Sequence, residues 1–263
     1  MKYFVVSDIH GKEDELNIIL EMYNPEEETL VFLGDYIDRG YKNIGVLETI
    51  MTMQLLHGRN KVKVLRGNHD ALFLDALTGD EGAYATWIMN GGVAVLEEVL
   101  AMEEPKDQST PTPSAWCLPQ KDMISLCTKH LLDKIEFLKN RTLLYYQDTS
   151  FLFTHAGFNY REEDWRNTKA SDFLWIRKHY FKPNKTGLIN VFGHTRTTLI
   201  RGVTGDNSVW VSPCKTYIGI DGGCAYGGQL NAVVLDSNNL KEMRVYVAEA
   251  RDTEVQVMSK SLE

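Results

Sequence analysis

Short apolar runs that stop abruptly at polar, glycine-containing turns recur along this chain of 263 residues. Bounded apolar runs of this length are typical of strands that are buried on both faces. We therefore predict a buried strand at each of the positions 3–6, 30–33, 62–65, 151–153, 191–192 and 218–220.

Helical patterns lie between these runs. Leu16, Ile19, Leu20 and Tyr23 recur on one helix face within residues 13–23, and residues 44–56 have a similar pattern. Alternation of strands and helices is typical of an α/β sheet core. The stretch at about 72–138 has a mostly helical pattern and no strand-rich part of its own. We predict one domain over residues 1–263, with this stretch as a helical insert over one edge of the core.

The composition is that of an ordinary globular protein, with 43 % hydrophobic and 24 % charged residues. The formal net charge of -8 argues against a nucleic-acid partner, because such partners are usually held by a broad basic surface. It does not argue against a phosphorylated substrate. Bound divalent cations can bring positive charge into a pocket whatever the outer surface carries.

Cysteine usage and the N-terminus indicate a cellular location. The four cysteines form no CxxC pair, which favours a reducing compartment and argues against a zinc knuckle. The apolar residues after Met1 and Lys2 are too few for a signal sequence, and no apolar run reaches membrane-spanning length. We predict a cytoplasmic protein without a membrane partner. The sequence leaves the oligomeric state open.

The predicted strands are followed by Asp, Asn or His. Loops at the carboxyl ends of strands in an open α/β sheet converge, so these side chains are expected at one edge. Oxygen and imidazole donors of this kind suit Mn, Fe or Zn. The candidate residues are Asp8, His10, Asp35, Asn68, His69, His155 and His194, with Asp221 as a further candidate.

Each motif alone also has a purely structural interpretation. Asp8 could cap the following helix, and residues 67–70 could form a simple turn. Residues 34–40 are denser, because two carboxylates and an arginine lie between glycines that permit tight turns. The remaining histidines, His57, His130 and His179, lie in loop or helical context, and we predict no catalytic task for them.

Taken in order, the motifs resemble the phosphoprotein phosphatase branch of the calcineurin-like metallophosphoesterases. They are Asp8-x-His10, Gly34-Asp35-x-x-Asp38-Arg39-Gly40, Gly67-Asn68-His69-Asp70, His155 and Gly193-His194. The resemblance spans residues 8 to about 235. It implies an α/β fold in which two mixed β-sheets pack as a sandwich flanked by helices.

The resemblance also implies two divalent metal ions. Asp8, His10 and Asp35 would hold one ion, and Asp35 would bridge it to a second ion held by Asn68, His155 and His194. The family mechanism assigns direct attack to a metal-bridging hydroxide, without a covalent phosphoenzyme. We favour Mn, with Fe or Zn as alternatives.

Further roles follow from the same resemblance. His69 would protonate the leaving oxygen, and Asp38 would orient its ring. Arg39 would clamp the phosphate. A second family arginine lies between the two late histidine motifs. We assign it to Arg177, with Arg161 and Arg166 as alternatives.

Two substrate classes fit these motifs: a phosphorylated protein or other small phosphomonoester, and a dinucleoside tetraphosphate cleaved symmetrically to ADP. We favour a serine/threonine protein phosphatase of the bacterial and phage type, because Trp87 and residues 90–92 resemble those members. Asp70 replaces the glutamate of the eukaryotic phosphatases, and Gly222 departs from a late Asp-Thr-Gly motif. A catalytically inactive binding module is a third interpretation, which the complete ligand set argues against.

Overall fold

The computed structural model describes residues 1–103, 114–249 and 255–261. Its first sheet is mixed, because β1, β2 and β3 run parallel while β9, β10 and β11 pair antiparallel. The order across this sheet is β11 (Val255–Ser261), β10 (Asn239–Glu249), β9 (Gln229–Asp236), β1 (Lys2–Val6), β2 (Glu28–Phe32) and β3 (Val62–Val64).

The second sheet is also mixed. β5, β6 and β8 run parallel, and β4 and β7 close the two edges antiparallel. The order is β4 (Tyr145–Gln147), β5 (Phe151–Thr154), β6 (Ile189–Phe192), β8 (Tyr217–Gly219) and β7 (Trp210–Val211).

Alternation along β1 shows how the two sheets pack. Tyr3 and Val5 belong to an apolar cluster that also contains Phe151 and Phe153 of the second sheet. The intervening Phe4 and Val6 face the opposite way, into a cluster with the helices. Successive strand side chains point to opposite faces, so β1 is buried on both sides. The sheets therefore form a sandwich.

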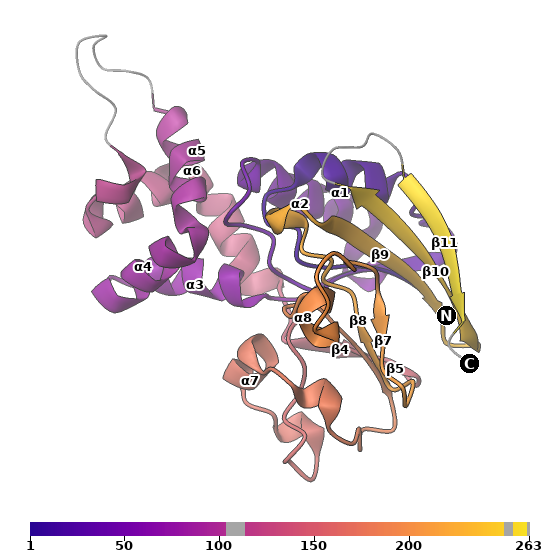
Figure 1. The fold of residues 1–263 in the computed structure, drawn as a ribbon. Coiled ribbons are helices and arrows are strands. Elements are labelled where there is room, and N and C mark those ends of the chain that lie inside the picture. The colour runs from indigo at the N-terminus through magenta and orange to yellow at the C-terminus, as the bar shows by residue number, and fades with distance from the viewer. Residues whose placement is uncertain (104–113, 250–254, 262–263) are drawn as a thin grey trace.

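Helices cover both outer faces (Figure 1). Over the first sheet lie α1 (Glu13–Leu20) and α2 (Asn43–Lys61), and α2 contains a non-helical Gly58 with φ 76°. Over the second sheet, α7 (Ala170–Trp175) and two short 3-10 turns at Trp165–Asn167 and His179–Phe181 accompany α8 (Thr197–Arg201). A further 3-10 turn, Cys224–Tyr226, packs through Cys224 into the cluster of the first sheet and its helices.

The helical region at one side of the sandwich contains α3 (Asn68–Ala76), α4 (Glu81–Trp87), α5 (Val93–Ala101) and α6 (Gln120–Arg141). A π-helical segment, Ile88–Gly92, joins α4 to α5, and a 3-10 turn, Ala115–Cys117, precedes α6. Its described part contains no strand, in agreement with the predicted pattern. The treatment of residues 1–263 as one domain stays a prediction.

The six predicted strands are present with small shifts in their ends, whereas β4, β7, β9, β10 and β11 were not predicted. The predicted α/β sandwich is what the structure shows. None of the helices within the described ranges combines the length and apolar character needed to cross a bilayer.

Candidate active site

The loops that follow the parallel strands of both sheets meet around one cavity of about 200 Å³. Parallel strands place their carboxyl ends at one edge, which is why residues far apart in the sequence converge there. Asp38 and His155 do not line the cavity, but they contact the lining residues His69 and Asn68. The predicted residues in the lining are Asp8, His10, Asp35, Arg39, Asn68, His69, Arg177, His194 and Asp221.

Backbone strain is concentrated at this cavity. Eight non-glycine residues in the described chain have positive φ, and six of them are candidate site residues. Residues held in such conformations cost on the order of 1–3 kcal/mol each and cluster at functional sites. The six are Asp8, His10, Asp35, Asp38, Arg39 and His194, with φ between 47° and 74°.

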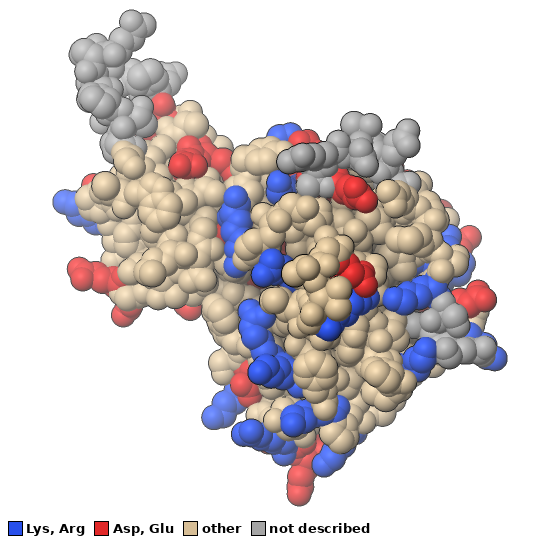
Figure 2. Space-filling view, in the orientation of Figure 1, with Lys and Arg blue, Asp and Glu red and all other residues tan. Residues whose placement is uncertain are grey.

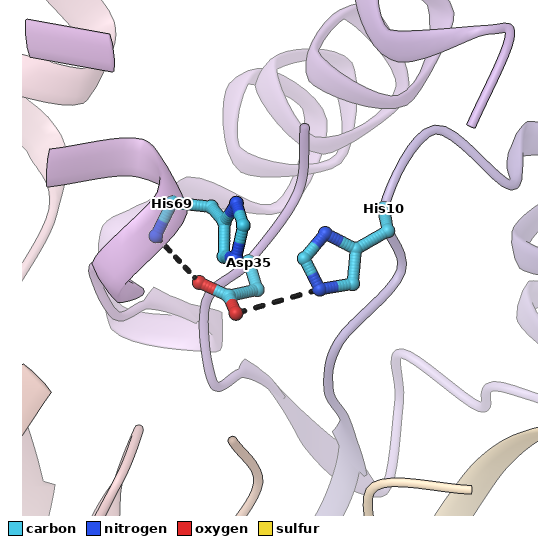
Figure 3. Close-up of side chains that lie close together, drawn as sticks. All are labelled: His10, Asp35 and His69. Carbon is cyan, nitrogen blue, oxygen red and sulfur yellow. Dashed lines mark hydrogen bonds and ion pairs between the residues drawn. The ribbon is translucent and has the colours of Figure 1, made fainter. Parts of the chain in front are cut away.

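His10, Asp35 and His69 form one group of metal-binding atoms, which lie within 4.8 Å of one another. Figure 3 shows both histidines beside the Asp35 carboxylate. His10 Nε2 is 3.5 Å from Asp35 Oδ2, and the His69 backbone N–H donates to Asp35 Oδ1 over 2.9 Å. His10 Nδ1 donates to the Ile37 carbonyl over 2.8 Å, so Nε2 is the acceptor of the ring; in this structure it faces Arg39.

Asp35, His155 and His194 form a second group, so Asp35 is shared by both. Asn68 Oδ1 lies 2.9 Å from His155 Nε2 and 2.8 Å from His194 Nδ1. His155 Nδ1 donates to the Leu33 carbonyl over 3.0 Å, so its Nε2 lone pair faces oxygen atoms. Acceptors that converge in this way are suited to holding a cation between them.

Asp8 lies in the same cavity but belongs to neither group. Both of its carboxylate oxygens accept from the His194 backbone N–H over 3.0 Å, and Oδ2 also accepts from the Ser7 hydroxyl. A Cβ at position 193 would lie 2.0 Å from Asp8 Oδ2, so only glycine permits this approach. The role of Asp8 as a ligand stays a prediction.

The charges in the cavity fit divalent cations. Burial, and then the nearby Asp221, raises the pKa of Asp8; burial, and then Asp8, raises the pKa of Asp35. Burial lowers the pKa of His155 to about 3 and depresses the pKa of His194, whose Nε2 has no partner among the described residues. Repelling carboxylates beside neutral imidazoles are the donor set that a cation stabilises.

His69, a member of the first group, also forms a dyad with Asp38. His69 Nδ1 lies 2.6 Å from Asp38 Oδ2, and the indole N–H of Trp87 donates to Asp38 Oδ1 over 2.9 Å. Burial, with a smaller contribution from Arg39, lowers the pKa of His69 to about 3. The sequence identified Trp87 only as part of a stretch that resembles bacterial and phage members; its contact with Asp38, 49 positions away, was not predicted.

Arginines surround the cavity opening. The two terminal nitrogens of Arg39 each lie 2.6 Å from a ring nitrogen, Nε2 of His10 and Nε2 of His69. Arg177 donates to the His194 carbonyl and the Thr195 hydroxyl over 3.3 and 3.1 Å. The alternatives Arg161 and Arg166 do not line the cavity, whereas Arg196, which was not predicted, does. Lys and Arg side chains follow the junction between the helical region and the sandwich (Figure 2).

Asp70 supports the shared ligand from behind. Its carboxylate accepts the backbone N–H groups of Asp35, Tyr36 and Gly67 over 3.0, 3.1 and 2.8 Å. Burial raises its pKa to about 6. A Cβ at position 67 would lie 2.1 Å from the Asp35 nitrogen, which explains the glycine there. Asp35 is therefore fixed by its backbone as well as by its side-chain partners.

Comparisons with known proteins point to one family. The sequence profile described as calcineurin-like phosphoesterase matches residues 1–221. The serine/threonine-protein phosphatase 1 of Salmonella typhimurium is 34 % identical over 91 residues, which cover 34 % of this chain and 38 % of that protein. The symmetrical bis(5'-nucleosyl)-tetraphosphatase of Actinobacillus pleuropneumoniae is 36 % identical over 81 residues, which cover 30 % of this chain and 28 % of that protein. The matched part is thus well under half the length of either relative.

Solved structures share the fold over nearly the whole chain. A protein provisionally named diadenosine tetraphosphatase has a TM-score of 0.58 at 17 % identity and covers 99 % of this chain and 93 % of its own. The cold-active protein-tyrosine phosphatase of a Shewanella species has a TM-score of 0.56 at 18 % identity. The match covers 100 % of this chain and 80 % of that protein. At these identities the likeness concerns the fold alone.

Proposed function

Because this chain belongs to the calcineurin-like phosphoesterase family, we propose that it hydrolyses phosphomonoesters with the help of two divalent cations. Family membership confirms the predicted family and fold class and places the chain among phosphoester hydrolases. The proposed ligands are Asp8, His10, Asp35, Asn68, His155 and His194.

One observation carries this proposal: Asp35 is common to two groups of ligand atoms and lies directly beside the His69–Asp38 dyad. Bound cations would supply Lewis-acid charge and activate water for attack on phosphorus. The buried carboxylates and neutral imidazoles described above are the protein's contribution to holding them.

The other residues act on the substrate itself. In the structure Nε2 of His69 accepts from Arg39, so delivery of a proton to the leaving oxygen requires Arg39 to turn to the phosphoryl group and Nε2 to be protonated, with Asp38 stabilising the proton on Nδ1. Arg39 and Arg177 line the same cavity and can clamp phosphoryl oxygens in bidentate fashion. Trp87 holds Asp38 in place.

The size of the cavity favours phosphomonoesters with varied leaving groups. Its volume of about 200 Å³ is below the 300–1,000 Å³ typical of pockets that enclose an organic ligand. The cavity therefore fits the phosphoryl group and leaves the rest of the substrate outside. Phosphoserine and phosphothreonine side chains suit this arrangement, and a serine/threonine phosphatase is among the matched relatives.

Symmetrical cleavage of a dinucleoside tetraphosphate is the second candidate. The observation that favours it is the match to a tetraphosphatase over a comparable stretch and at comparable identity. We retain Mn as the favoured metal, with Fe or Zn as alternatives, and a cytoplasmic location as part of the proposal.

The test measures hydrolysis of an aryl phosphate, a phosphothreonine peptide and diadenosine tetraphosphate by the Mn-loaded protein, with nucleotide products separated by chromatography. We expect turnover of the first two to stop on chelation and to return with Mn. Undiminished turnover after verified metal removal would overturn the metal-dependent mechanism. A preference of about 100-fold in kcat/KM for the dinucleotide, with ADP as the product, would favour the second candidate instead.

A further inference from the structure

Arg196 is a third arginine at the cavity; its positive charge acts on the nearby Asp221, but its N–H groups donate to none of the residues that the structure describes. Its side chain lines the cavity beside the ligand candidates. It makes no hydrogen bond or ion pair with any residue that the structure describes; instead its Cζ lies 4.3 Å from the centroid of the Tyr226 ring. A guanidinium carries five N–H donors. These donors are therefore available to a ligand.

The backbone and Tyr226 hold Arg196 in this place. Arg196 directly precedes α8, and its carbonyl accepts the Ile200 N–H over 3.1 Å. The guanidinium of Arg39 also lies 5.0 Å from the Tyr226 ring centroid, so one aromatic ring contacts the phosphate-clamp arginine and Arg196. Since the fold uses the backbone of Arg196 and not its donors, replacing the side chain should leave the fold intact.

A groove adjoins the cavity on the side of Arg196. Its volume is about 530 Å³, within the range of pockets that take an organic ligand. It shares Arg196, Leu199, Gly223 and Tyr226 with the cavity, so the two are continuous. The rest of its lining consists of neutral residues, which include Thr198, Thr204 and Asn207. Arg196 is thus the single charged residue in the lining of this groove.

We propose that the groove receives the leaving group of the phosphoester, and that Arg196 binds a second anionic group carried by that leaving group. The inference rests on the proposed phosphomonoesterase function, which places the scissile phosphoryl group in the adjoining cavity. A planar guanidinium recognises a carboxylate or a phosphate with two parallel hydrogen bonds. The preferred substrates are therefore phosphomonoesters with a second anion beside the scissile ester.

A pair of phosphothreonine peptides tests this preference. They differ only in whether Asp or Asn follows the phosphorylated residue. We expect the Mn-loaded protein to favour the Asp peptide by about tenfold in kcat/KM, a typical value for a charge-assisted contact. Arg196→Gln should remove that preference while retaining turnover of the Asn peptide. Arg161→Gln, an equal loss of charge at an exposed arginine outside the cavity and the groove, should retain the preference.

Non-hydrolysable probes test binding of the second anion at Arg196 without depending on turnover, and therefore independently of the proposed function. Phosphonoacetate carries a carboxylate beside its phosphonate, and methylphosphonate lacks it. By calorimetry, the Mn-loaded protein should bind phosphonoacetate about tenfold more tightly, and Arg196→Gln should bind both equally. If no phosphomonoester is turned over but this difference is found, the subsite stands and the proposed function fails.

The opposite results would overturn the subsite. These are equal binding of the two probes by the unmodified protein, or an equal loss of turnover of both peptides in Arg196→Gln. A further comparison of ADP with an aryl phosphate identifies the source of the second anion. A loss confined to ADP in Arg196→Gln would assign the subsite to a phosphate chain, and a loss confined to the Asp peptide would assign it to a peptide carboxylate.

Discussion

His155 and His179 are both fully buried histidines, and burial lowers the pKa of each to about 3. Their surroundings differ. His155 follows β5 and faces Asn68 and Asp35, whereas His179 bonds to Asn190 and packs against the rings of Tyr180, Phe192 and Tyr217. We call the second environment the outer aromatic layer; it comprises His179 and these three rings.

This difference teaches that burial and a depressed pKa do not by themselves indicate a functional histidine. Around His155, acceptors from three other segments converge, those of Asp35, Asn68 and His194, and this arrangement suits a cation. Around His179, apolar rings complete the packing and a single amide satisfies Nε2. The decisive feature is the convergence of acceptors.

The same substitution in both environments gives the largest expected effect. His155→Gln should lower the Mn content and reduce hydrolysis of aryl phosphates to the level of the chelated protein, because it removes one ligand of the second group. His179→Gln should retain both Mn and activity and should lower the free energy of unfolding by about 1–3 kcal/mol. Metal analysis and denaturant titration measure the two effects. Loss of Mn from His179→Gln would contradict the distinction between a ligand histidine and a packing histidine.

His69 lies between these extremes, because it belongs to the first group of possible ligand atoms but is proposed to act on the leaving group. His69→Asn should retain Mn and should lower kcat on alkyl phosphates by about 10²–10⁴, the usual contribution of general acid catalysis. The loss should be smaller on nitrophenyl phosphates, whose leaving groups need less protonation. Asp35→Asn is the control that should lose metal. Equal metal loss in the two variants would contradict the acid role.

Trp87 tests whether the helical region contributes to catalysis through Asp38. Trp87→Phe keeps an aromatic ring but removes the N–H that donates to Asp38. We expect kcat on alkyl phosphates to fall by about tenfold, since hydrogen bonds to charged groups contribute about 1.5–3 kcal/mol. KM and Mn content should stay unchanged. An equal loss on alkyl and nitrophenyl phosphates would indicate a general packing defect instead.

The smallest expected effect concerns pH. The pKa of His179 falls from 6.5 in the unfolded chain to about 3 in the folded protein, so between about pH 3 and pH 6.5 it is mainly the unfolded chain that binds this proton. Its contribution to stability is therefore lost as the pH falls. Between pH 7 and pH 6 the stability advantage of the unmodified protein over His179→Gln should shrink by about 0.7 kcal/mol. Urea titrations of both proteins at the two pH values measure this change. A constant difference would show that His179 does not titrate on unfolding.

The sequence determined the strands that carry the site and the residues at their ends. β1, β2, β5 and β6 contain short apolar runs and are buried on both faces, and the residues of each strand alone reveal this property. Asp8, Asp35 and His194 follow such runs directly, so their common location could be predicted without coordinates. β10 was not predicted; its first four residues, 239–242, are all exposed, and its buried apolar residues begin only at Met243.

Only the tertiary structure decided which partners act on these residues. The bond from Trp87 to Asp38, the bonds from the Asp35 and Tyr36 N–H groups to Asp70, and the stacking of Arg196 on Tyr226 each join segments that no local pattern connects. The structure also shows that, of the equally buried His155 and His179, only His155 faces converging acceptor atoms. The physical reason is that burial of a strand follows from its own side chains, whereas a contact depends on where the packing of two sheets brings distant loops together.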